Sequence, residues 1–180
     1  MHEPSPVPAA LLEGAREEAK AYLRIEGAAD DQVIDQLVAA AAALAEAFTA
    51  QMLLVRSATE TIPARRDWTR LASCPVRSVT RIEAMADTGA TALPATAYDV
   101  DIGHHGEGWV RVADPVGLAR LRVTLTAGLA ADWTRLPEPV RLGILRLAAH
   151  GYTHRDASED AGPPAAVAAL LRPWRRMRII

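Results

Sequence analysis

The stretch Asp30–Thr49, DDQVIDQLVAAAAALAEAFT, decides the fold of the helical part of this sequence. Two acids open it, and either can cap free backbone N–H groups and favour the positive end of a helix. Apolar residues then recur with the i, i+3, i+4, i+7 spacing of one buried helical face. These residues are Ile34, Leu37, Val38, Ala41, Leu44, Ala45 and Phe48. The pattern predicts a long amphipathic α-helix.

The opposite side of this predicted helix is unusually apolar. A solvated face would carry Lys, Glu or Gln, but here it is filled by Ala39, Ala40, Ala42, Ala43 and Ala47. An alanine-rich composition explains the run through high helix propensity alone. The alternative is a helix that packs on two sides, one of them against another subunit. The residues themselves leave both interpretations open.

The composition limits the class of protein. At 180 residues and a net charge of −2, the chain fits one domain with no overall attraction to nucleic acid or membrane. The single cysteine, Cys74, excludes an internal disulfide and a multi-cysteine metal site. The N-terminus lacks a signal-peptide pattern, and the longest apolar run is far shorter than the ~20 residues of a membrane span. We therefore expect a cytosolic protein without a membrane partner.

The order of patterns along the chain predicts the architecture. A first helix over about 9–23 and the long helix form an αα-hairpin, and a third helix covers about 137–156. Between them, short alternating segments predict strands, most clearly Leu121, Val123 and Leu125 opposite polar neighbours. The predicted fold class is α+β, a helical bundle (9–51 and 137–156) with an inserted antiparallel β-meander (53–126), as one domain over 1–180.

Two histidines are the first candidates for chemistry. His150 and His154 lie one helical turn apart, so both could bind one metal ion in a hydrolase. A zinc-protease motif needs a glutamate directly after the first histidine, and that residue is Gly151. Possible third ligands are Asp156, Glu159 and Asp160. We favour the interpretation that these are two histidines at the end of a helix and that they bind no metal.

The other candidate sites lack a catalytic pattern. The GHHGEG loop (103–108) lacks the GK[ST] ending of a phosphate-binding loop, and a turn between strands explains it. Asp99 and Asp101 alternate on one strand face, as a solvated face would. No serine lies in a nucleophile-elbow pattern, and thiol catalysis by the one cysteine is disfavoured. We therefore expect no enzymatic activity and no cofactor.

The C-terminal segment RPWRRMRII (172–180) is the best functional candidate. Tryptophan and arginine dominate protein interfaces, so the segment suits partner docking. The same composition could bind a nucleic acid by charge and stacking, which is the alternative function. A third possibility is a segment packed on its own domain. The candidate interface residues are Leu170, Leu171, Arg172, Trp174, Arg175, Arg176, Met177 and Arg178.

The ordered set of segments resembles one known family. It comprises EEAKAYLRIEGAADDQVIDQLVAAAAALAEAFTAQML, CPVRSVTRIEAM, AYDVDI, RVTLTAGLAADWTRLPEPVRLGILRLAAHGYTHRD and PPAAVAALLRPWRRMRI. The chain is similar to the head–tail connector (adaptor) proteins of tailed bacteriophages, and among them to the adaptor of prophage-like gene transfer agents. Gly151 and His154 depart from the family pattern, so neither carries weight in the resemblance.

The resemblance implies a structural role. Such adaptors form a ring beneath the dodecameric portal, extend the DNA channel without reading sequence, and offer a platform to a tail-side connector or stopper protein. They are assembled in the host cytoplasm and end in the virion or particle. The portal-docking tail would map to 163–180, so truncation after Gly162 is expected to leave the fold intact. The subunit interface would use Ala39, Ala40, Ala43 and Ala47.

Overall fold

The computed structural model describes residues 2–86, 89–154 and 164–176. They form two compact units. The β unit comprises Met1–Pro6 and Val55–Leu129, and the helical unit comprises Val7–Leu54 and Ala130–Ile180. In sequence, the Val55–Leu129 segment of the β unit is inserted between the two halves of the helical unit. The α+β class with an antiparallel insertion is confirmed.

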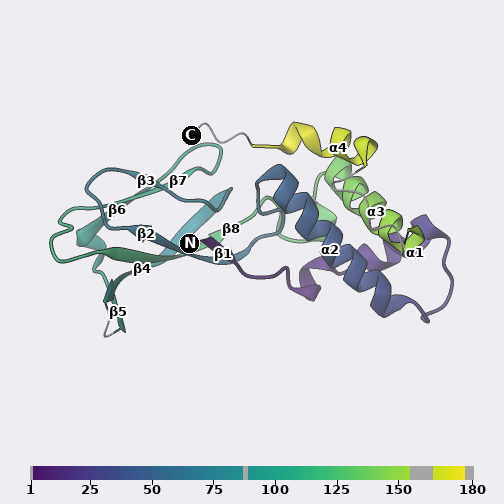
Figure 1. Ribbon diagram of the computed structural model, residues 1–180, viewed down its shortest axis with the longest axis horizontal. Helices are drawn as coiled ribbons and strands as arrows, with labels where there is room; N and C mark the ends of the chain where they lie inside the picture. Colours follow the sequence, from purple (N-terminus) through teal and green to yellow (C-terminus); the bar gives the residue numbers. More distant parts are fainter. Residues whose placement is uncertain (1, 87–88, 155–163, 177–180) are drawn as a thin grey trace. The chain divides into compact units, whose positions relative to one another are not determined.

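In the described residues of the helical unit, four α-helices pack around one core (Figure 1). Its elements are η1 (Ala9–Leu12), α1 (Ala15–Leu23), α2 (Asp31–Thr49), η3 (Trp133–Arg135), α3 (Glu138–Thr153), α4 (Ala165–Leu171) and η4 (Arg172–Trp174). Helix α2 packs mainly on α3, and α3 also contacts α1 and α4. The core residues include Ala19, Ile34, Val38, Ala45, Trp133, Val140, Ile144, Val167 and Leu171.

The first helix differs from the single element predicted over about 9–23. Gly14 adopts a φ of +86°, which residues other than glycine rarely adopt, and it separates η1 from α1. The helix ends at Leu23, as predicted, and is followed by Arg24, which is left-handed with a φ of 57°. Hydrophobic spacing continued across Gly14, so the periodic pattern did not reveal the break.

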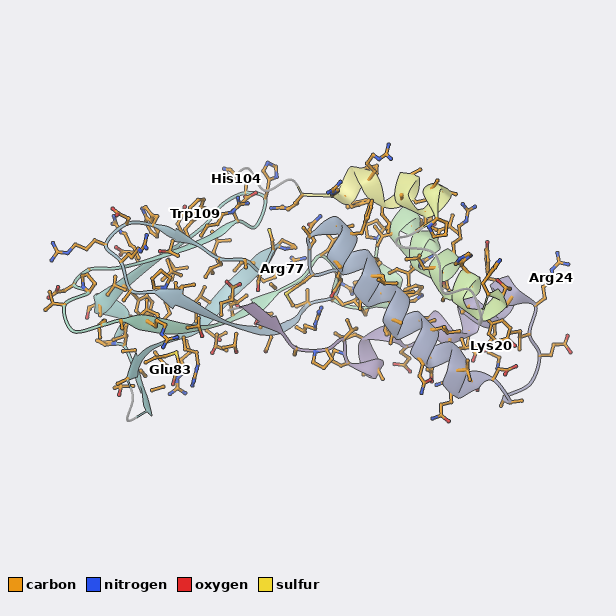
Figure 2. All side chains as sticks on the ribbon, viewed as in Figure 1. Lys20, Arg24, Arg77, Glu83, His104 and Trp109 are labelled. Atoms are coloured by element: carbon orange, nitrogen blue, oxygen red, sulfur yellow. The ribbon has the colours of Figure 1, made fainter. Side chains whose placement is uncertain are left out.

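The start of α2 is held by side chains rather than by a cap. Asp30 makes no side-chain cap hydrogen bond, which corrects the expectation for that residue, and instead its Oδ2 accepts a bond of 2.9 Å from the Tyr152 hydroxyl. Asp31 lies in the first turn, where a carboxylate favours the helix dipole. Asp31 Oδ1 also accepts a bond of 2.7 Å from Lys20 Nζ, which joins α1 to α2. Lys20 is labelled in Figure 2.

The β unit contains two antiparallel sheets. Their strands are β1 (His2–Pro4), β2 (Arg56–Pro63), β3 (Thr69–Arg70), β4 (Val76–Ala86), β5 (Gly89–Ala92), β6 (Tyr98–Ile102), β7 (Gly108–Val112) and β8 (Arg120–Ala127). One sheet has the order β1-β2-β8-β4-β5 and the other β3-β7-β6. Neighbouring strands of the hairpins β4–β5 and β6–β7 are consecutive in sequence, whereas β8 returns between β2 and β4. The N-terminal arm adds β1 to the edge of the first sheet.

The core of the β unit follows the alternation expected from sequence. Leu121, Val123 and Leu125 of β8 are buried, and β8 pairs with β2 and β4 along its whole length. The loop before β7 contains a glycine whose lack of a side chain allows the close approach of another loop. A Cβ on Gly106, which has a φ of +75°, would lie 2.8 Å from the Cα of Pro75. Among the described residues, no helix is both long and apolar enough to cross a membrane.

Candidate functional site

The outer face of α2 is an uncovered apolar feature of the helical unit. Leu44 was predicted to be buried, but it is 58% exposed and shares its face with the exposed residues Ala40, Ala43 and Ala47. The buried face instead uses Ala42 and Thr49 together with Ile34, Val38, Ala41 and Ala45. We call Ala40, Ala43, Leu44 and Ala47 the outer stripe. Their i, i+3, i+4, i+7 spacing places a second apolar face on this helix.

Ala39, the fourth predicted interface residue, lies beside the outer stripe and has a different environment. It lines a pocket of about 440 Å³ at the flank of α2, where α2 faces η1 and the start of α1. Its apolar side chains come from η1, α2 and Val7, whereas α1 contributes Arg16 and Glu17. We call the charged residues of the lining the rim. The pocket residues are Val7, Ala9, Ala10, Leu12, Glu13, Gly14, Arg16, Glu17, Asp35, Val38 and Ala39.

An ion-pair network fixes the geometry of this pocket. Arg16 Nε donates to Asp35 Oδ1 at 2.7 Å, its Nη2 also pairs with Asp35, and its Nη1 lies 3.4 Å from Asp31 Oδ2. The hydrogen bond and charge of Asp35 raise the pKa of Arg16 above its usual value. The hydrogen bond from Lys20, with the charges of Lys20 and Arg16, lowers the pKa of Asp31. The two helices are thus held in register by charge.

The C-terminal helix does not offer Leu171 to a partner. Leu171, a predicted interface residue, is 0% exposed, and Val167 one turn earlier is also buried. A Cβ on Gly143 of α3 would lie 3.0 Å from Leu171 Cδ2, so α4 packs closely where α3 lacks a side chain. This corrects the assignment of Leu171, which is a core residue here. Leu170, its neighbour, is only partly covered.

The residues after α4 dock on the C-terminal end of α2. The Arg176 N–H donates to Thr49 O at 2.9 Å, and Gln51 Nε2 donates to Trp174 O. The Arg175 guanidinium lies 5.6 Å from the centre of the Phe48 ring. Positive charge near free carbonyls at a helix C-terminus is favourable. Arg172 and Arg175 remain exposed in this arrangement, and Met177 and Arg178 lie outside the described residues.

The histidine pair does not form a metal site within the described part of the chain. The rings of His150 and His154 stack with centroids 4.3 Å apart, and His154 Nδ1 lies 2.8 Å from Thr153 Oγ1. Residues 2–86, 89–154 and 164–176 contain no group of three potential ligands suited to a metal ion. The suggested third ligands Asp156, Glu159 and Asp160 all fall outside those ranges.

One surface of the β unit was not recognised from sequence. Arg111 of β7 stacks over Trp68 at 4.6 Å and pairs with Asp99 of β6 at 2.9 Å. Two residues further along β7, Arg70 lies 5.8 Å from the centre of the Trp109 ring, and Trp109 is labelled in Figure 2. Asp99 was interpreted as one of two solvated acids. Cross-strand pairing of Asp99 with Arg111 was the missing information, since it depends on the β6–β7 register.

Solved structures from one kind of particle share this fold. The chain is similar to one from the neck of an empty gene transfer agent (GTA) particle computed with C6 symmetry, at 24% identity and a TM-score of 0.78. It is also similar to a chain from the virion of a native GTA particle (27%, 0.77) and to one from the neck of a native GTA particle computed with C12 symmetry (25%, 0.76). Each likeness covers 100% of this chain and 97% of the other. No protein-family model and no curated protein matches the sequence. The resemblance inferred from the sequence segments is confirmed.

Proposed function

We propose that this chain, which has the fold of GTA neck proteins along its full length, is a structural head–tail connector (adaptor) subunit. In this role it forms a ring under the portal, extends the DNA channel and joins the capsid to the tail. The observation that carries the proposal is the full-length likeness to subunits of GTA necks and virions. The role requires protein contacts and no chemical step.

The exposure of the outer stripe of α2 supports the proposal that the chain forms a ring. A ring subunit needs surfaces that are apolar yet uncovered in the single chain, and Leu44 with its three alanine neighbours meets that description. Small residues allow the backbones of adjacent subunits to approach closely. A dodecameric ring is the proposed stoichiometry, and one of the similar necks was computed with C12 symmetry.

The tail is the proposed portal contact, in a form revised by the packing of α4. Leu171 belongs to the core, so the contact would use Leu170, Arg172, Trp174, Arg175, Arg176, Met177 and Arg178. Arg172 and Arg175 are exposed, which suits such a contact. A tail-side connector or stopper protein would bind another surface of the ring, and DNA would pass through without sequence recognition.

The two rival functions have less support. A nucleic-acid-binding tail is supported only by its basic composition, whereas the solved structures that share the fold are chains of particle necks and a virion. A metal hydrolase would need a third ligand beside His150 and His154, and the described residues supply none.

Reconstitution with the portal protein of the same particle tests the proposal. The purified chain is mixed with portal rings, and the products are separated by size and weighed by native mass spectrometry. We expect one discrete complex that contains a ring of this chain on each portal. Failure to co-migrate with portal at any salt concentration would argue against a connector.

A further inference from the structure

The pocket beside α2 combines an apolar wall with an acidic rim. Its wall is formed by Val7, Ala9, Ala10, Leu12, Val38 and Ala39, and its volume is about 440 Å³. Glu13, Glu17 and Asp35 contribute three carboxylates to the rim, against the single cation of Arg16. Ala39, one of its lining residues, adjoins the outer stripe.

The charge of the rim is only partly compensated. Arg16 is fully engaged with Asp35 and Asp31. Neither Glu13 nor Glu17 forms an ion pair with a basic side chain in the described part of the chain. An occupant that suits both wall and rim has an apolar stem and a cationic end, which describes an arginine side chain. The same rim would repel a nucleic acid backbone.

The helical unit carries such side chains at the other end of α2. The tail turn, Arg172–Arg175, has two exposed arginines and no acid, and Arg176 holds it against Thr49. Asp35, at the pocket, and Thr49 are fourteen residues apart on one helix, or about 21 Å at 1.5 Å per residue. The tail turn of a subunit therefore lies far from that subunit's own pocket.

We propose that the acidic pocket of one copy receives the arginine side chains of the tail turn of the next copy. In this arrangement Arg172 and Arg175 serve the ring instead of the portal, and the portal contact is left to the other tail residues. This is a head-to-tail contact between two different surfaces. Such a contact generates a closed ring when the rotation that relates neighbouring copies returns to the first copy after a whole number of subunits. The occupant is a second copy of this chain, because acidic pocket and basic turn are complementary in charge. The contact also brings the tail turn alongside Ala39 and the outer stripe. The inference rests on the proposed ring.

Cysteine cross-linking tests this contact. The variant E13C/R172C places one thiol at the pocket and one on the tail turn, and portal-templated rings are oxidised and run on a denaturing gel. A disulfide needs Cα atoms within about 7 Å. The pocket and the tail turn adjoin positions of α2 that are about 21 Å apart, so we expect no bond within one chain. We expect a ladder of covalent multimers that reaches the full ring.

The controls isolate the contact. E13C alone and R172C alone should stop at trace dimers, and E26C/R172C, with an exposed acid outside the pocket, should give no ladder. The wild-type chain should give none, because Cys74 is buried. A ladder from E26C/R172C as strong as that from E13C/R172C would overturn the assignment.

Charge reversal provides a second test with a separate readout. E13R and R172E should each reduce ring formation on portal by about tenfold or more, and E13R/R172E should restore most of it because the ion pair is re-formed in reverse. If wild-type rings form but no ladder and no restoration are seen, the contact is wrong and the connector role stands. If the wild-type chain forms no ring on portal, the connector role itself fails.

Discussion

Two apolar surfaces of the helical unit, one on α4 and one on α2, differ in whether the chain itself covers them. Leu171 of α4 is 0% exposed against Gly143, whereas Leu44 of α2 is 58% exposed within its stripe of alanines. Both leucines lie in helices whose apolar residues recur at helical spacing, so composition alone would suit either one to a hydrophobic contact. The difference is that the chain itself covers one and leaves the other open. Apolar composition thus identifies a contact surface without identifying its partner.

Truncation after Gly162 should give the largest effect. It removes Val167 and Leu171 from the core, and burial of two such side chains contributes about 3–6 kcal/mol. Domains are commonly stable by only about 5–15 kcal/mol, so the helical unit should be severely destabilised. Chemical unfolding followed by helical circular dichroism measures this. If the truncated chain kept wild-type stability, the tail would not be part of the core, and its role would be limited to docking.

A matched pair of leucine variants sharpens the comparison. Leu171→Ala should lower the free energy of unfolding by about 2–5 kcal/mol, because it leaves a cavity beside Gly143. Leu44→Ala should change it by less than about 0.5 kcal/mol, since most of that side chain already faces solvent. Denaturant titration of both variants gives the two values. Equal losses would remove the distinction between the two surfaces.

Charge on the outer stripe should affect assembly and spare the subunit. Ala43→Glu adds a carboxylate at an exposed position, so the free energy of unfolding should change by no more than about 0.5 kcal/mol. Ring formation on portal should fall at least about tenfold, because a charge buried between subunits is costly. Ala29→Glu, exposed in the turn before α2, is the matched control. Comparable damage to stability and assembly would make the stripe part of the core.

Acidification should produce the smallest effect. The pKa of Asp31 is lowered in the folded chain, chiefly by the Lys20 hydrogen bond, so its charged form stabilises the fold above the unfolded value of about 3.9. That contribution is lost as the pH falls through the lowered pKa. Asp31→Asn should therefore flatten part of the loss of stability below about pH 4. Glu26→Gln, without an ion pair among the described residues, should leave the acid profile unchanged.

Periodicity predicted the elements well because it reflects their local geometry. The long helix, the strand with Leu121, Val123 and Leu125, and the third helix all lie close to their predicted bounds. The break at Gly14 was not predicted, because one left-handed residue can interrupt a helix without disturbing the hydrophobic spacing. The first helix was therefore drawn too long.

Assignments that depend on tertiary contacts were harder to predict. Leu44 fits the buried spacing of α2 as well as Leu37 does, and only the position of α3 decides which is covered. Leu171 looked like part of an exposed tail, since nothing local shows that α3 has a glycine opposite it. The pairing of Arg111 with Asp99 likewise depends on strand register.

The position of this chain in an assembled particle is the most direct test of the account. Particles that contain the protein are decorated with an antibody fragment against it and imaged by electron microscopy. The account predicts label at the junction of head and tail, as one ring per particle. Label spread over the capsid or along the tail, or particles without any label, would contradict it.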